Sequence, residues 1–290
     1  MSRIAYVNGR YLPHARASVH IEDRGYQFSD GVYEVVGIRN GRFLDLDWHN
    51  DRLQRSLDEL RIPVPMSMPA LNAVLAEVVR RNRVRDGIVY LQVTRGVARR
   101  DHAFPADGTR PALVITARSA SFPARDKVEQ GLKVIGIPDI RWSRRDIKTV
   151  SLLPNVLAKQ AAKEAGAYEA WQVDGDGLVT EGSSTNAWIV TADGHLVTRP
   201  ASNDILNGIT RLRIIELARA RGYTVEERPF TLEEAKKARE AFLSSTTSYV
   251  LPVVQIDDVV LGNGRAGSVA LELRDLYEGF IGSHTAADAA

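Results

Sequence analysis

The amino-acid sequence predicts an α+β fold in two domains, and three observations support this prediction. The chain has 290 residues, which is long for one ordinary domain and enough to bury two hydrophobic cores. In its first part, strand pairs are followed by helices and then by further strands, an order typical of α+β domains. The polar, proline-interrupted stretch SASFPARDKVEQG then divides the chain. We therefore predict a small N-terminal domain over residues 1–119, a linker over 120–127 and a larger C-terminal domain over 128–290.

Two hairpins, two helices and two further strands account for the first domain. Asn-Gly pairs at positions 8–9 and 40–41 interrupt strand-like stretches, and this dipeptide is a strong signal for a two-residue hairpin turn. Leucines at helical spacing predict an amphipathic helix over 47–61, and a second helix over 69–82 has a proline near its first turn. The stretches IVYLQVTRG and ALVITARS complete the domain as strands.

The second domain is predicted to contain more strands than helices. Its strand-like stretches are LKVIGIP, EAWQVD, LVTEG, NAWIVT and AFLSS. Helices are expected near 154–165, 209–221 and 232–240. The first of these has a proline near its start and Gly166 just past its end, and the third begins with the capping box TLEE.

Composition excludes several classes of function. The net charge of +2 is spread along the chain without a basic run, so neither a nucleic acid nor a membrane surface is the expected partner. The absence of cysteine excludes disulfides, thiolate metal sites and cysteine nucleophiles. No apolar run approaches about 18 residues, and the start, MSRIAYVNGRYLP, lacks the pattern of a signal peptide. We expect a cytoplasmic protein with small-molecule substrates.

Two motifs imitate binding sites that their context does not support. The run GNGRAG, over 262–267, matches a dinucleotide-binding pattern but lacks a following βαβ unit, so we predict a plain turn and helix start. Asp174 and Asp176 imitate the opening of a calcium loop, but Leu178 occupies the third ligand position and a hairpin turn fits better. Neither HExxH nor GxSxG occurs, and the histidines lack zinc-like spacing, so no metal site is predicted.

One lysine stands out among the seven in the chain. The other six lie in charged helices or near the linker and have the pattern of solvated surface residues. Lys148 follows three arginines and precedes the uncharged run TVSLLPNVLA. Burial and positive neighbours would both favour a neutral, nucleophilic amine. These residues alone leave two interpretations open, a functional lysine and an ordinary partly buried one.

A resemblance to a known family gives this lysine a role. The stretch RWSRRDIKTVSLLPNVLAKQAAKEAGAYEAWQVDGDGLVTEGSSTNAWIV resembles the core of the class IV, or fold type IV, pyridoxal-phosphate enzymes. EDRGYQFSDGVYEV, HNDRL, QVTRG, LNGITR and LSSTTS extend the resemblance over about residues 3–280. It implies a two-domain α+β enzyme, with a small α/β sandwich domain and a larger domain resembling a β-barrel. The chain is similar above all to the D-amino acid aminotransferases.

The resemblance also implies a binding site for pyridoxal 5′-phosphate. Lys148 would be the catalytic lysine, which forms a Schiff base with the cofactor and then shuttles a proton. Glu181 matches the carboxylate that pairs with the pyridine nitrogen and keeps it protonated. Arg52 matches the phosphate arginine, and Leu206 resembles the residue that packs against the ring. Further phosphate donors would be Ile209 and Thr210 at a helix start, and the hydroxyls of Ser245 and Thr246.

Substrate choice depends on the loop TRGVARRDHAFP. It resembles the loop of D-amino acid aminotransferases whose arginine and histidine bind the substrate carboxylate, by register Arg100 and His102, with Tyr33 as a third donor. In that family the loop reaches over from the other subunit, which implies a homodimer. The sequence departs from the family pattern at two positions. Arg99 adds a positive charge beside Arg100, and if it points inward it would turn preference toward acidic substrates. Pro154 replaces an expected glycine.

The resemblance therefore predicts a D-amino acid aminotransferase. In its reaction an amino group passes from a D-amino acid such as D-alanine to a 2-oxo acid such as 2-oxoglutarate. Alternatives with the same cofactor are a branched-chain L-amino acid aminotransferase, an (R)-amine transaminase and an aminodeoxychorismate lyase. The Arg-Asp-His sequence at 100–102 argues against these three. A relative that binds the cofactor without catalysis is disfavoured because both Lys148 and Glu181 are present.

Overall fold

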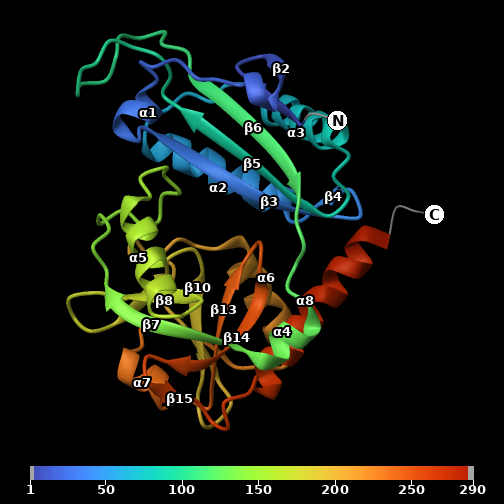
Figure 1. The fold of residues 1–290 in the computed structure, drawn as a ribbon, viewed down its shortest axis with the longest axis vertical. Helices are drawn as coiled ribbons and strands as arrows, with labels where there is room; N and C mark the ends of the chain where they lie inside the picture. The colour runs from blue at the N-terminus through green and yellow to red at the C-terminus, as the bar shows by residue number, and fades with distance from the viewer. Residues whose placement is uncertain (1–2, 287–290) are drawn as a thin grey trace. The chain divides into compact units, whose positions relative to one another are not determined.

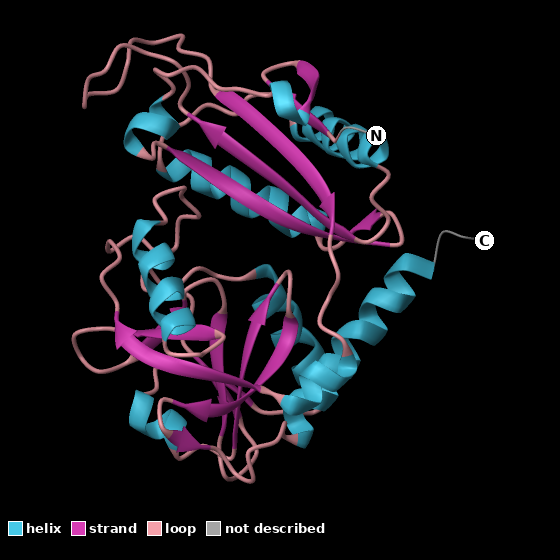
Figure 2. Ribbon diagram, viewed as in Figure 1, coloured by secondary structure: helices cyan, strands magenta, loops and turns pink. Residues whose placement is uncertain are grey.

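The chain divides into two compact units. A computed structural model describes residues 3–286, with side chains through residue 284. The first unit runs up to Ser121 and also takes in Ile147–Ser151, whereas the second contains Phe122–Asp146 and the chain from Leu152 onward. Figure 1 labels most elements of each unit, and Figure 2 distinguishes helices from strands. Lys148 thus lies on a short return of the chain into the first unit.

The first unit is built on one antiparallel sheet of six strands. Its order is β2-β1-β6-β5-β3-β4, and each neighbouring pair is antiparallel. The strands are β1 (Ile4–Val7), β2 (Arg10–Pro13), β3 (Gly31–Arg39), β4 (Arg42–Phe43), β5 (Gly87–Thr94) and β6 (Ala112–Ser119). The helices are η1 (His14–Arg16), α1 (Arg24–Phe28), α2 (Leu46–Glu59) and α3 (Met68–Asn82).

Both predicted hairpin turns are confirmed by their backbone angles. Asn8 and Gly9 have φ values of 45° and 88°, and Asn40 and Gly41 have 50° and 79°. Two successive residues with positive φ form the turn whose twist matches that of the flanking strands. The two pairs therefore join β1 to β2 and β3 to β4 without extra loop residues.

The core of the first unit lies between the sheet and helices α2 and α3. Both helices contribute to one cluster of buried side chains, Leu53 and Leu57 from α2 and Leu71 and Leu75 from α3. The predicted leucine spacing of α2 is therefore the spacing of its buried face. Val32 and Val36 of β3 join the same cluster. Because side chains alternate along a strand, Tyr33 and Glu34 lie on opposite faces of the sheet, and Glu34 faces the helices.

The second unit contains a nine-stranded mixed sheet. The order of its main path is β12-β11-β10-β13-β14-β7-β8-β9, and β15 pairs with β14. The strand β9 also contacts β10, so the sheet curls back on itself like a barrel. The strands are β7 (Leu132–Pro138), β8 (Glu169–Val173), β9 (Val179–Gly182), β10 (Asn186–Val190), β11 (Leu196–Thr198), β12 (Val225–Glu227), β13 (Glu240–Ser245), β14 (Tyr249–Ile256) and β15 (Val259–Val260).

Helices of the second unit partly match the sequence predictions. They are α4 (Arg125–Gln130), α5 (Leu153–Glu164), α6 (Ile209–Ala220), α7 (Leu232–Lys236) and α8 (Ser268–Ala286). The capping box of α7 forms, with Thr231 accepting from the backbone of Glu234. The helix predicted over 232–240 is wrong beyond Lys236, because Glu240 already belongs to β13. There it pairs with Val190, and its carboxylate accepts from two backbone N–H groups at the start of α8.

The two rejected motifs are turns, as predicted. Gly262 and Gly264 have positive φ values in the turn before α8. Asp174 accepts from the N–H groups of Asp176 and Leu178 through its side chain, which closes a tight turn. Within the described residues no His, Cys, Asp and Glu group is arranged to hold a metal ion. No helix in the same part of the chain has the length and apolarity needed to cross a membrane.

Candidate active site

Lys148 lies beside Tyr33 in the first unit. The backbone N–H of Tyr33 donates to the Lys148 carbonyl at 3.0 Å, and the N–H of Val150 donates to the Gly31 carbonyl at 3.0 Å. This pairing along β3 places the Lys148 Nζ atom 4.3 Å from the centroid of the Tyr33 ring. Among the described side chains no acidic group forms an ion pair with Lys148. The amine therefore lies over an aromatic ring and has no carboxylate partner among the described residues.

Arg52 belongs to a buried cluster of three polar side chains between α2 and β3. Its Nε atom lies 2.8 Å from Oε1 of Glu34, and its Nη2 atom lies 2.7 Å from Oε2. His49, one turn earlier on α2, lies with Nδ1 2.7 Å from the same Oε2. Only 1% of Glu34 and 3% of His49 is exposed. Arg52 therefore has a fixed orientation, set by a forked contact with one carboxylate.

The charges in this cluster shift two pKa values. Burial alone would raise the pKa of Glu34, but the charge of Arg52 and the hydrogen bonds from Arg52 and His49 lower it to about 2. Burial lowers the pKa of His49, and the charges of Arg52 and Lys148 lower it further against the opposite effect of Glu34. Glu34 is therefore a carboxylate at neutral pH, and Nδ1 of His49 must be the donor in their hydrogen bond.

Arg100 and His102 both pack on the ring of Phe28. The Arg100 guanidinium carbon lies 4.7 Å from the Phe28 ring centroid, and the His102 ring centroid lies 5.4 Å from it. Between them, the carbonyl of Asp101 accepts from Nη1 of Arg24 at 2.6 Å. Arg24 is buried and also donates to Asp30. The two predicted carboxylate ligands are exposed, whereas the groups that hold their loop are largely buried.

Glu181, in the second unit, accepts hydrogen bonds from three surrounding residues. Its Oε1 atom accepts from Nη1 of Arg141. Its Oε2 atom accepts from the side-chain amide of Asn186 at 3.1 Å and from the backbone N–H of Leu206 at 3.1 Å. Glu181 is 5% exposed, so both oxygens are fixed by these donors inside the protein. Two of the predicted cofactor residues, Glu181 and Leu206, are thus hydrogen-bonded to each other.

Arg141 connects Glu181 to a second carboxylate. It forms a forked contact with Asp139, at 3.0 Å from Nε and 2.7 Å from Nη2, and Thr180 donates to the same carboxylate at 2.7 Å. Burial would lower the pKa of Arg141, but the charges of Glu181 and Asp139 raise it. Arg141 therefore remains charged, and its charge lies against the carboxylate of Glu181.

Asn186 fixes the turn that precedes α6. Its side-chain amide donates to the Leu206 carbonyl at 2.9 Å as well as to Glu181. Gly208, the residue before α6, packs so closely here that an added Cβ would lie 2.1 Å from Oδ1 of Asn186. A side chain at this position would displace Asn186, so the turn requires glycine for space rather than for an unusual backbone angle.

The remaining predicted phosphate donors lie at the ends of two packed elements. Ile209 and Thr210 begin α6, where no side chain caps the first backbone N–H groups. Such groups favour an anion. Ser245 ends β13, Thr246 follows it in a turn, and α6 packs against β13. Within the second unit, these predicted donors therefore lie at the ends of two elements that pack against each other.

Sequence reasoning missed four residues that hold the predicted ones. Glu34 and His49 hold Arg52, and Arg141 and Asn186 hold Glu181. The sequence could have indicated a buried role for Glu34, because this residue occupies the helix-facing register of an otherwise apolar strand, VYEVV. The sequence marks Arg141 only as a positive neighbour of Lys148. Nothing in the sequence indicates the partner of either residue.

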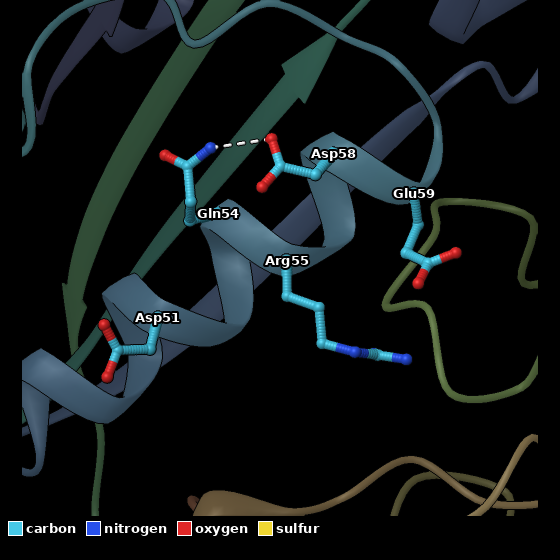
Figure 3. Close-up of a pocket in the computed structure, with 5 residues that line it drawn as sticks. All are labelled: Asp51, Gln54, Arg55, Asp58 and Glu59. Atoms are coloured by element: carbon cyan, nitrogen blue, oxygen red, sulfur yellow. Dashed lines mark hydrogen bonds between the residues drawn. The ribbon is translucent and has the colours of Figure 1, made fainter.

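The outer face of α2 carries an open polar depression. It is lined by Asp51, Gln54, Arg55, Asp58 and Glu59, as Figure 3 shows, and Gln54 donates to Asp58 at 2.8 Å. None of the predicted site residues lines it. Because Arg52 points to the buried side of the same helix, this depression is separate from the polar cluster around Arg52.

Comparison with known proteins identifies the family. The family model described as amino-transferase class IV matches residues 31–256. The chain belongs to the class IV aminotransferases. It is 38% identical to a D-alanine aminotransferase of Staphylococcus aureus, over 97% of this chain and 98% of the relative. It is 42% identical to a D-alanine aminotransferase of Bacillus licheniformis, over 96% of this chain and 97% of the relative.

Solved structures confirm the fold of this class IV aminotransferase. The branched-chain amino acid aminotransferase of Escherichia coli is 25% identical, with a TM-score of 0.87 over 96% of this chain and 94% of that chain. A T.th. branched-chain amino acid aminotransferase, solved with pyridoxamine 5′-phosphate, is 27% identical, with a TM-score of 0.87 over 96% of this chain and 93% of that one. The predicted two-domain fold type IV architecture is therefore confirmed.

Class IV aminotransferases depend on pyridoxal phosphate, and the polar groups of this chain suit that cofactor. The group requires an amine, a fixed carboxylate and donors for a phosphate. Lys148 offers an amine without an acidic partner among the described residues. Glu181 offers a buried carboxylate, and Arg52 offers a buried cation. The chain is a pyridoxal-phosphate-dependent aminotransferase, as predicted.

Proposed function

We propose that this class IV aminotransferase acts on D-amino acids. It would take the amino group of a donor such as D-alanine and pass it to a 2-oxo acid such as 2-oxoglutarate. The observation that carries this proposal is the identity of 38% and 42% to two D-alanine aminotransferases over nearly the whole chain. The solved branched-chain enzymes are less similar in sequence, at 25% and 27%.

The predicted cofactor residues would divide three tasks. The cofactor, when bound, supplies an electron sink for the bond to the substrate Cα atom. Lys148 would hold it covalently and carry the proton that leaves and returns to that carbon. Glu181, fixed by its donors, would accept the hydrogen bond of the pyridine N–H. Phosphate binding would fall to Arg52, the start of α6 at Ile209 and Thr210, and the hydroxyls of Ser245 and Thr246, with Leu206 against the ring.

The substrate carboxylate would bind to Arg100 and His102, with Tyr33 as a further donor. Guanidinium and imidazole groups can donate hydrogen bonds to a carboxylate. Both side chains are exposed and pack against the ring of Phe28. Tyr33 lies beside Lys148. The residue that would donate to the substrate carboxylate and the residue that would carry the proton are therefore paired through their backbones. Lys148 would then reach one face of the substrate Cα atom, which selects one hand of the amino acid.

A homodimer is part of the proposal. The family resemblance implies that the loop with Arg100 and His102 reaches into the active site of the other subunit. In the first unit, Ile21 and Tyr26 are each 76% exposed, so large apolar side chains are available there to a partner surface. Sedimentation or light scattering of the purified protein should give twice the chain mass. A monomeric mass in an active preparation would exclude shared sites. The cytoplasmic location stays a prediction.

A coupled assay with four donors tests the substrate class. Purified protein is supplied with pyridoxal phosphate and assayed with D-alanine, L-leucine, (R)-1-phenylethylamine and aminodeoxychorismate, with 2-oxoglutarate as acceptor for the first three. We expect kcat/KM to be highest for D-alanine. A higher value for L-leucine would instead make the chain a branched-chain enzyme, and release of pyruvate from aminodeoxychorismate would make it a lyase.

A further inference from the structure

The cluster of Glu34, His49 and Arg52 is costly to bury. It lies between α2 and a strand whose neighbouring inward side chains, Val32 and Val36, belong to the hydrophobic core. Placing a guanidinium and a carboxylate here removes both from water, and such a pair gives little net stability compared with apolar residues. Compared with apolar packing of the same space, the cluster is therefore not explained by stability alone, although each partner needs the others once it is buried.

The geometry of the cluster controls the direction of the Arg52 guanidinium. Glu34 binds Nε and Nη2 of Arg52 at 2.8 and 2.7 Å, which fixes the plane of the guanidinium group. His49 donates to the same carboxylate at 2.7 Å, so Glu34 cannot rotate without losing both partners. The pKa of Glu34 is lowered to about 2, so this arrangement persists at neutral pH.

We propose that Glu34 and His49 are positioning residues that aim Arg52 at the cofactor phosphate, so that they control the preference for phosphorylated over unphosphorylated cofactor. This inference rests on the proposed role of Arg52. Glu34 would act by fixing the guanidinium plane, and His49 by fixing Glu34. Neither would touch the cofactor ring, so neither should change how an unphosphorylated analogue binds.

The test compares two ligands that differ only in the phosphate. The full chain is stripped of cofactor and titrated with pyridoxal 5′-phosphate and with pyridoxal, and the visible absorption of the bound form gives each affinity. The ratio of the two affinities measures the phosphate contact alone. Melting temperatures of the stripped variants record folding separately.

The variants remove one contact at a time. Glu34→Gln keeps the size of the side chain but loses the forked ionic contact, and we expect the ratio to fall roughly tenfold or more, the worth of one charge-assisted hydrogen bond. His49→Leu removes the support of Glu34, and a fall of roughly threefold is expected. His49→Asn restores a donor near the position of Nδ1 and should restore most of the ratio. If Glu34→Gln does not fold, the pair of His49 variants carries the test.

A control on the same helix separates positioning from stability. Asn50 is 8% exposed and donates to Asn72 of α3 at 3.1 Å, so Asn50→Ala also removes a buried polar contact of α2. Its ratio should equal that of the unaltered protein even if its melting temperature falls. Equal losses for both ligands in the Glu34 and His49 variants, or no loss for either, would overturn the inference. Failure of the unaltered protein to bind pyridoxal phosphate at all would instead defeat the proposed function.

Discussion

Arg141 and Glu181 form a buried ion pair in which each side chain is only 7% exposed. A cation against this carboxylate stabilises its ionised form and makes it a weaker base. If Glu181 pairs with the pyridine nitrogen, Arg141 therefore favours the state in which the proton stays on the ring and the carboxylate stays ionised. Arg141 would then tune the carboxylate partner of the ring, whereas its sequence context suggested only an effect on Lys148.

Replacing Arg141 with methionine should weaken cofactor binding. We expect the dissociation constant of pyridoxal phosphate to rise roughly tenfold, because Glu181 loses a charged donor and part of its fixed orientation. The absorption spectrum of the bound form should also become more dependent on pH. Arg145→Met is the matched control, since Arg145 contacts the same Asp139 and pairs with Asp204 rather than with Glu181. Equal effects of the two variants would assign Arg141 a purely structural role.

Lys148→Ala should remove both the covalent link and turnover. Borohydride treatment of the cofactor-loaded protein should add the mass of a reduced cofactor to a peptide that contains Lys148, and the variant should show no such addition. We expect kcat to fall by roughly a thousandfold or more, since the acid–base group is lost. Lys163 is exposed on α5, so Lys163→Ala serves as control. A labelled peptide lacking Lys148 would contradict the assignment.

Arg100→Ala should raise KM for D-alanine more than Arg99→Ala does. Arg100 packs on Phe28 beside His102, and loss of one charged contact to a carboxylate corresponds to roughly a tenfold to hundredfold change. Both arginines are exposed neighbours, so each variant controls for the other. A larger effect of Arg99→Ala would mean that the register of the carboxylate loop is shifted by one residue. An effect of Arg99→Ala confined to D-aspartate and D-glutamate would assign it to side-chain selection.

Glu34 should make stability depend on pH. Its pKa is lowered from 4.5 to about 2 in the folded chain, so it stabilises the fold at pH values above its unfolded pKa, and that stability is lost as the pH falls toward 2. A shift of this size corresponds to roughly 3 kcal/mol at pH 7. Denaturant unfolding should therefore show Glu34→Gln as destabilised at pH 7 and much less so near the folded pKa. Asp51→Asn, on the exposed face of the same helix, should show no comparable trend.

The elements of this fold that depend on local chemistry could be predicted from the sequence. Asn-Gly pairs specify hairpin turns through their own φ preferences, and leucine spacing specifies the buried face of α2. The same holds for Thr231, which caps α7 from within its own turn. The end of α7 could not be predicted in this way, because the charged residues after it have a helical pattern, whereas Glu240 belongs to β13 and has its partners in distant segments.

The groups that hold the site residues in place could not be predicted for a related reason. Polar side chains in a sequence have the pattern of solvated residues, and only the packed structure shows which of them are buried together. Asn186 and Glu181 lie close in sequence, but their shared partner Leu206 comes from a different segment. The family resemblance supplied the residues expected to touch the cofactor. The contacts that orient them had to come from the structure.

Gly208→Ala tests the link between Glu181 and the turn before α6. The added Cβ would lie 2.1 Å from Oδ1 of Asn186, so Asn186 must move and lose its bonds to Glu181 and Leu206. We expect a loss of roughly 1–3 kcal/mol in the free energy of unfolding, as for other overpacked positions, together with weaker binding of pyridoxal phosphate. Gly175→Ala is the matched control, because nothing lies within 4 Å of an added Cβ at that position. If Gly208→Ala lowered stability without weakening cofactor binding, Asn186 would hold the turn but not the carboxylate of Glu181.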